Sequence, residues 1–143
     1  MKHLTVRMLA VSTLMLSVLT ASAEKIDTSI GDLKYQVDTE TKEATVTGGV
    51  GKNLYSVSIP DSIGYDNINY PITHIGKEAF KGYRGLTTVS LGNCLKVIED
   101  NAFEGCVELV KLGMPNSLDS IKGGAFASCG FSRKLPSYPR KAG

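Results

Sequence analysis

Histidine and cysteine are scarce in this sequence of 143 residues, and their scarcity limits the chemistry that the chain can perform. Of the two histidines, only His74 lies beyond the first 23 residues, and it has no second histidine and no cysteine at ligand spacing. Cys94, Cys106 and Cys129 are separated by 11 and 22 intervening residues, which matches no zinc pattern. Metal sites and catalytic triads need several such groups together, so we predict no metal, no cofactor and no catalytic residue.

Motifs of catalysis are also missing. The sequence contains no G-x-S-x-G, no phosphate-binding loop and no H-E-x-x-H. The only neighbouring acidic groups are Glu99 with Asp100 and Glu104 with Glu108. A glycosidase needs two facing carboxylates in a cleft, whereas these lie on a turn that we expect to be solvated. The sequence therefore predicts a protein that is not an enzyme.

Excess positive charge is absent from the body of the chain. Residues 24–143 contain 14 basic and 14 acidic residues, and residues 24–129 carry a net charge of about −4. Binding to nucleic acid needs a basic face, so we predict no nucleic-acid partner. The basic residues Arg133, Lys134, Arg140 and Lys141 gather in the last 14 residues, where residues 130–143 are expected to form an irregular, solvated tail.

Only one long apolar run exists, and it lies at the start of the chain. Lys2 and Arg7 precede the apolar run Met8–Thr20, whose 13 residues are too few to cross ~30 Å of hydrocarbon. Small residues follow at Ala21 and Ala23. We interpret residues 1–23 as a signal peptide cleaved after Ala23, with an uncleaved helical anchor as the alternative. The remaining chain would have no transmembrane segment and would be secreted or at the cell surface, with periplasmic retention left open.

An internal repeat is the most informative feature of the sequence. Three segments of eight residues align without gaps at a period of 23 residues, which is typical of solenoid repeats. They share an isoleucine, an alanine four residues later and a phenylalanine next to it. These positions are Ile75, Ile98 and Ile121, Ala79, Ala102 and Ala125, and Phe80, Phe103 and Phe126. We predict that matching positions form the core and that positions varying between units face solvent.

The spacing within each unit predicts its parts. Residues 86–91 and 109–114 are L-x-x-L-x-L-like strings that end in the alternation of a strand. The Ile-x-x-x-Ala-Phe segment that follows suits a short helical or 3₁₀ turn. Gly82, Gly105 and Ser128 then end the turn, where a permissive backbone is needed. The predicted fold is an α+β repeat solenoid over residues 54–129, built from 23-residue units.

With these motifs in place, residues 75–129 resemble the BspA-type leucine-rich repeats of bacterial surface proteins. The upstream residues 24–53 resemble the β-rich region that often precedes such repeats, with strands expected at 33–37 and 44–48. Residues 54–60 repeat the strand string. The resemblance implies a curved solenoid, secreted or at the cell surface, used for adhesion. It does not identify a ligand.

Residues 61–71 are an insert between the first strand string and the first Ile-x-x-x-Ala-Phe segment. The insert places turn residues between Tyr65 and Tyr70. One interpretation is a hairpin that extends the sheet at its N-terminal end. The other is a ligand-binding loop in which Tyr65 and Tyr70 grip the ligand.

The third unit raises two further questions. Cys106 and Cys129 share a frame with Tyr83, so they are either buried thiols or, in adjacent coils ~4.8 Å apart, an oxidised pair. Residues after Cys129 neither complete a strand nor cap the array, and solenoids need capped ends. We expect a marginal monomer, self-association through the uncapped C-terminal coil, or a truncated copy of a longer array.

The functional hypothesis is a non-enzymatic binding or adhesion module. Its partners would be protein or glycan at a host or neighbouring-cell surface. The candidate contact surface is the concave strand face, formed by Ser56, Ser58, Thr88, Ser90 and Lys111. The alternative is a truncated fragment with a structural role and no ligand of its own.

Overall fold

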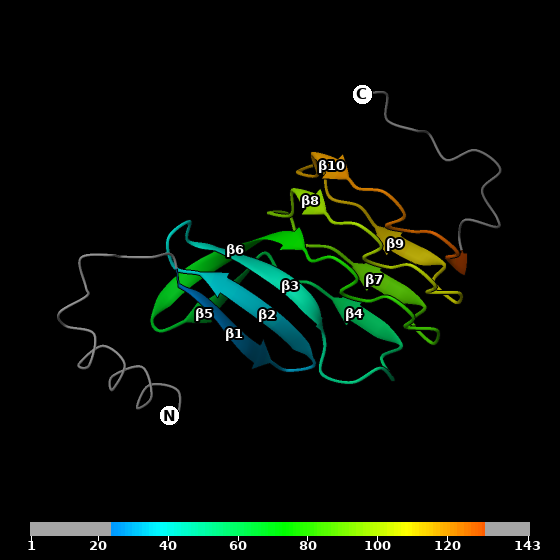
Figure 1. Cartoon of the computed structure of the whole chain (residues 1–143), viewed down its shortest axis with the longest axis horizontal. Coiled ribbons are helices and arrows are strands. Elements are labelled where there is room, and N and C mark those ends of the chain that lie inside the picture. Colours follow the sequence, from blue (N-terminus) through cyan, green and yellow to red (C-terminus); the bar gives the residue numbers. More distant parts are fainter. Residues whose placement is uncertain (1–23, 131–143) are drawn as a thin grey trace.

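The computed structural model describes residues 24–130, which form two sheets (Figure 1). The larger sheet has the order β1-β2-β3-β6-β8-β10, with β5 paired to β6, and the smaller has the order β4-β7-β9. The predicted signal peptide and residues 131–143 of the predicted tail lie outside the described residues. The strands are β1 (Lys25–Ile30), β2 (Leu33–Asp38), β3 (Glu43–Gly49), β4 (Ser56–Ser58), β5 (Ser62–Tyr65), β6 (Ile68–Ile75), β7 (Thr88–Ser90), β8 (Val97–Ile98), β9 (Lys111–Gly113) and β10 (Ser120–Ile121).

The 23-residue period corresponds to one coil with a strand in each sheet. The predicted strand strings form β4, β7 and β9, which pair in parallel, so this part of the prediction is confirmed. The repeat isoleucines lie in the other sheet, where Ile75 is opposite Ile98 and Ile98 is opposite Ile121. Residues one period apart are therefore neighbours in space, and their side chains face the same way.

The N-terminal residues extend the larger sheet. The two strands expected from the sequence are present as β2 and β3, and β1 is an additional strand that the sequence analysis missed. β1, β2 and β3 pair antiparallel, and β3 then pairs in parallel with β6. The insert is a hairpin of β5 and β6, as the first interpretation predicted. Its two-residue turn has positive φ at Asp66 and Asn67, typical of a type I′ hairpin turn.

The helical form of the predicted helical or 3₁₀ turn is not confirmed, because residues 24–130 contain no α-helix. Local bonds between residues three apart are present, since the Ala102 N–H donates to the Glu99 carbonyl at 3.3 Å. The segments expected to be helical are turns, and their first isoleucine belongs to a strand. Backbone conformation is one reason. Glu78, Asn101 and Gly124 share a frame and all have positive φ, between 56° and 70°, which a right-handed helix cannot contain.

Hydrogen bonding is the second reason, because these turns pair with the next coil. The N–H groups of Phe103 and Gly105 donate to the carbonyls of Ala125 and Ala127, at 2.7 and 2.8 Å. The intervening Glu104 N–H donates locally to the Asn101 carbonyl at 3.2 Å. An α-helix would need every N–H for its own ladder. Gly82 and Gly105, as predicted, provide the permissive backbone that ends each turn, with φ of 75° and 78°.

The core is a stack of identical layers. Phe80 and Phe103 stack with ring centroids 5.2 Å apart, and Phe103 and Phe126 stack at 5.3 Å. The repeated alanines are buried, as predicted from their frame. Burial decreases in the third coil, where Ile121 is 37% exposed while Ile98 is fully buried. The repeat isoleucine is therefore expected to contribute more to stability in the second coil than in the third.

Replacement of Ile98 by alanine should reduce the free energy of unfolding by about 2–5 kcal/mol, because it leaves a cavity between two coils. The matched substitution Ile121→Ala removes a partly exposed side chain and should cost less than half as much. Urea unfolding followed by circular dichroism measures both values. Equal losses for the two variants would contradict the difference in packing.

Candidate functional site

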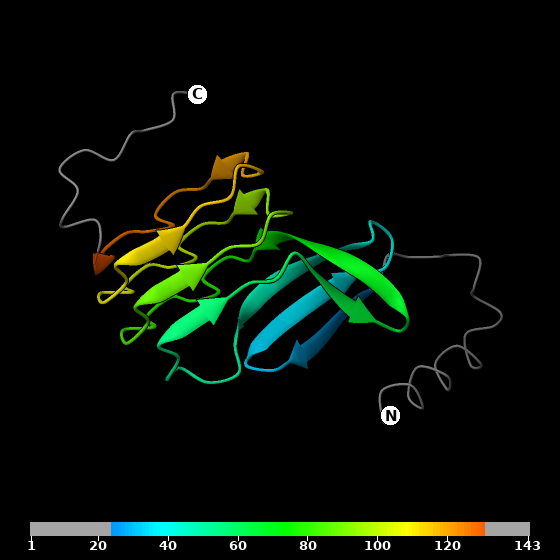
Figure 2. The same cartoon turned by 180° about the vertical axis from the view of Figure 1, so that it is seen from behind.

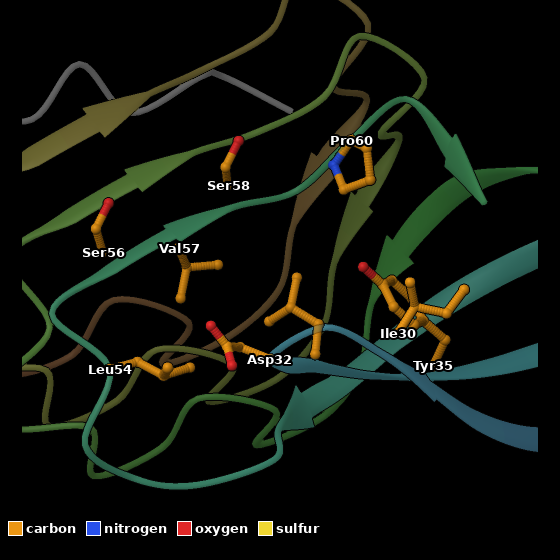
Figure 3. Close-up of a pocket in the computed structure, with 9 residues that line it drawn as sticks. Ile30, Asp32, Tyr35, Leu54, Ser56, Val57, Ser58 and Pro60 are labelled. Atoms are coloured by element: carbon orange, nitrogen blue, oxygen red, sulfur yellow. The ribbon is translucent and has the colours of Figure 1, made fainter.

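The five residues of the predicted contact surface lie together on the smaller sheet. Parallel pairing places Ser56 opposite Thr88 and Thr88 opposite Lys111, while Ser58 is opposite Ser90. Figure 3 shows Ser56 and Ser58 pointing to one side of β4 and Val57 pointing to the other. We call the outward surface of Ser56, Ser58, Thr88, Ser90 and Lys111 the polar face.

Strand alternation separates the polar face from the core. Val57 and Val89 are buried beneath it, whereas Ser56, Ser58, Ser90 and Lys111 are exposed and Thr88 is half-buried. Four hydroxyl groups can each donate and accept hydrogen bonds, and Lys111 adds one positive charge. Such a surface can bind amide, hydroxyl or carboxylate groups.

Tyr55 adjoins the polar face and was missed by the sequence analysis. Its side chain is 71% exposed, and the Thr87 hydroxyl donates to its carbonyl at 2.9 Å. A methyl group on Gly85 would lie 3.6 Å from the Tyr55 ring, so the ring covers this glycine. One feature of the sequence could have identified Tyr55. It is an aromatic residue within the strand motif of residues 54–60, at a position where an exposed side chain was expected. Exposed tyrosines commonly supply contact area at binding surfaces.

The two tyrosines of the insert do not form an exposed pair. Tyr70 is 2% exposed and belongs to the core, and Tyr65 is partly buried and packs against that core. In the hairpin, Tyr70 is opposite Ile63 and Tyr65 is opposite Ile68. The insert therefore does not form a loop that could hold a ligand between both tyrosines, because the Tyr70 side chain is buried in the core.

The titratable groups outside the polar face make surface contacts. His74 Nδ1 lies 2.9 Å from the Thr73 hydroxyl, and Glu104 and Glu99 form ion pairs with Lys81 and Lys122 at 3.4 and 3.7 Å. Exposed ion pairs of this kind contribute little to stability. Among residues 24–130, no group of three or more histidine, cysteine, aspartate or glutamate side chains could hold a metal ion. No helix in that range is long and apolar enough to cross a membrane.

The cysteines of the repeat frame are buried, free thiols. The Cys106 thiol donates to the Phe80 carbonyl at 3.1 Å, and the Cys129 thiol donates to the Phe103 carbonyl at 3.1 Å. The neighbouring Cys129 thiol, followed by burial, raises the pKa of Cys106 far above its ordinary value. In the first coil Tyr83 occupies the same frame, and its hydroxyl accepts a hydrogen bond from the Gly49 N–H at 3.0 Å. This frame therefore places a hydrogen-bonding side chain in the core.

Comparisons with known proteins agree with this architecture. Residues 51–137 match the family model described as the BspA type leucine rich repeat region. A leucine-rich repeat protein from Bacteroides ovatus is similar in structure, with a TM-score of 0.68 and 28% identity over 74% of this chain. A leucine rich repeat protein of T. pallidum is similar with a TM-score of 0.61 and 26% identity over 72% of this chain.

This chain spans less than half the length of the two proteins just described. It covers 28% of the Bacteroides ovatus protein and 46% of the T. pallidum protein. A leucine rich cell surface protein from Faecalibacterium prausnitzii shares the fold at 21% identity, with a TM-score of 0.54 over 76% of this chain and 35% of that one. A search of curated proteins finds no match.

The burial of Cys106 and Cys129 predicts that thiol reagents will distinguish them from the half-buried Cys94. The thiolate is the reactive form. Burial keeps reagents away from both thiols, and the raised pKa of Cys106 further suppresses its thiolate. In the native chain, an aromatic disulfide reagent should label Cys94 first, and the other two thiols should react only after unfolding. The variant Cys94→Ser should show no fast reaction. Fast native labelling of Cys106 or Cys129 would contradict the described packing.

Proposed function

Because the chain belongs to the BspA type leucine rich repeat family, we propose that it is a non-enzymatic binding protein of the cell exterior. Its polar face would contact protein or glycan on a host or neighbouring cell. The observation that carries this proposal is the gathering of Ser56, Ser58, Thr88, Ser90 and Lys111 on one face of a rigid sheet. Exposed Tyr55 adds an aromatic contact at its border.

The proposed location rests on the first residues of the chain. The charged, apolar and small-residue order of residues 1–23 supports export, although this segment lies outside the described residues. One structural neighbour is described as a cell surface protein, which is consistent with the same location. Repeat proteins of this architecture use sheet faces for binding.

The area of the polar face limits its affinity. Three strands ~4.8 Å apart, with three residues each at ~3.3 Å, cover on the order of 150 Å². A stable protein interface buries about 800 Å² on each partner. A single copy would therefore bind weakly, and adhesion would come from many copies acting together on one surface.

Replacement of Thr88 and Ser90 by glutamate should abolish adhesion, because it adds two charges at the centre of the polar face. The chain from Glu24 onward contains every described residue and can be attached in many copies to beads. Retention of the beads on cultured epithelial cells is then measured, before and after protease or glycosidase treatment of the cells. We expect at least a tenfold loss of retained beads.

The matched control is Thr45→Glu with Thr47→Glu. These residues also lie two apart on one strand, with one half-buried and one exposed side chain, but on the larger sheet. This variant should adhere like the wild type, and circular dichroism should show that both variants fold. Unchanged adhesion of the Thr88 and Ser90 variant, or no adhesion of wild-type beads to the untreated cells, would refute the proposal.

A further inference from the structure

The two sheets end at different places along the stack of coils. Beyond β6, the larger sheet continues through β3, β2 and β1, whereas β4 is the last strand of the smaller sheet. Figure 1 shows β4 at the end of the row β9, β7, β4, and Figure 2 shows the same step from behind. Within residues 24–130, the side of β4 that faces away from β7 has no strand partner.

The hydrogen bonds of β4 identify the groups on its open side. The Tyr55 carbonyl accepts from the Thr88 N–H at 3.3 Å, and the Ile59 N–H donates to the Ser90 carbonyl at 2.8 Å. Successive residues of a parallel strand alternate the side to which their backbone groups point. With Tyr55, Val57 and Ile59 bonded toward β7, the N–H and C=O groups of Ser56 and Ser58 point to the open side.

A groove of about 360 Å³ adjoins this open edge. Its β4 side includes Leu54 and Val57, and the opposite side includes Ile30 from β1 and Tyr35 from β2 (Figure 3). Leu33, the first residue of β2, also lines the groove. Leu33, Tyr35 and Val57 are buried, while Ile30 is 44% exposed at the rim. The groove is therefore apolar where the larger sheet extends past the smaller one.

The groove also carries one charge. Asp32 lies in the turn between β1 and β2, and it is an exposed member of the groove lining. Its backbone carbonyl accepts from the Val50 N–H at 2.8 Å, which holds the turn against the chain leading to β4. A basic side chain on a ligand would therefore meet the Asp32 carboxylate at this end of the groove.

We propose that an extended peptide segment of another protein binds here as a fourth strand beside β4. Its backbone would pair with the N–H and C=O groups of Ser56 and Ser58. Every second side chain would lie in the groove and should be apolar, and a flanking lysine or arginine would meet Asp32. Strand addition obtains affinity from the backbone and specificity from alternate side chains. This site uses the backbone of Ser56 and Ser58, whereas the polar face uses their side chains, and neither proposal requires the other.

The proposal is tested with the isotope-labelled chain from Glu24 onward and a blocked heptapeptide of sequence KTVTVTK. Nuclear magnetic resonance measures amide hydrogen exchange at each residue. The peptide should slow exchange of the Ser56 and Ser58 amides by about tenfold or more, because it supplies acceptors that residues 24–130 do not provide for them. The charge-reversed peptide ETVTVTE should bind several-fold more weakly because of Asp32.

Two further peptides examine the backbone geometry. N-methylation of every second residue removes the N–H groups from one edge of the peptide. One peptide is methylated at its odd-numbered residues and the other at its even-numbered residues, so that the two settings block opposite edges. Only one setting should abolish binding, because a strand presents one edge to β4. Equal binding of both settings would overturn the proposal.

Matched variants locate the groove. Ile30→Glu places a charge in its lining and should weaken binding of KTVTVTK about tenfold. Ile68→Glu is the control, since Ile68 is similarly exposed at 41% but lies at the hairpin turn. Asp32→Lys, which leaves the apolar residues in place, should reverse the preference between the two peptides even if Ile30→Glu fails to fold.

Besides equal binding of the two N-methylated peptides, three results would overturn the proposal. The first is that neither KTVTVTK nor ETVTVTE slows exchange at Ser56 and Ser58. The second is that these amides are already protected without peptide, because residues of the same chain or a second copy then cover the edge. The third is an equal effect of Ile30→Glu and Ile68→Glu. None of these results bears on bead adhesion, so failure here and failure of the polar face are distinguishable.

Discussion

Each coil of this protein donates backbone hydrogen bonds to the coil that follows it. In the turns, N–H groups such as that of Phe80 bond to a carbonyl of the next coil, here that of Ala102, while the intervening N–H groups bond locally. A coil can satisfy its backbone only when its neighbour has the same conformation at the same position. The 23-residue period is the consequence in sequence, because any insertion within a turn would misalign this whole set of bonds.

The core follows from the same alignment. Side chains in one frame stack directly, so Phe80 and Phe103 lie face to face and the small Ala102 lets the turn approach the sheet closely. Polar atoms in the core are satisfied in the same way. The Cys106 thiol bonds to a carbonyl of the preceding coil, and no buried side-chain nitrogen or oxygen atom in the described part of the chain lacks a partner.

Because side chains alternate along each strand, the same strands supply both the core and the outer surface. On the smaller sheet, one set of side chains is buried and the other forms the polar face, whose positions are held by three parallel strands. The N-terminal strands serve a different purpose. By extending only the larger sheet, they protect one end of the core and leave the edge of β4 and its apolar groove accessible.

Much of this organisation could be predicted from the sequence, because a repeat makes local patterns informative about distant contacts. The period identified the strands β4, β7 and β9, the stacked isoleucines, alanines and phenylalanines, and the residues that share the polar face. The insert allowed two interpretations, and pairing of β5 with β6 decided between them by burying Tyr70. A spacing pattern alone cannot separate a buried aromatic residue from an exposed one.

The remaining features depend on hydrogen bonds between segments far apart in the chain. An Ile-x-x-x-Ala-Phe spacing is compatible with a helical turn when it is considered alone. Only the carbonyls of the next coil make the extended turn the better arrangement. The exposure of Tyr55 and the open edge of β4 likewise depend on which strands are neighbours. The sequence by itself determined the repeat, its core and its polar positions. The tertiary structure decided the turn conformation and the accessible edges, because these depend on partners that no local pattern contains.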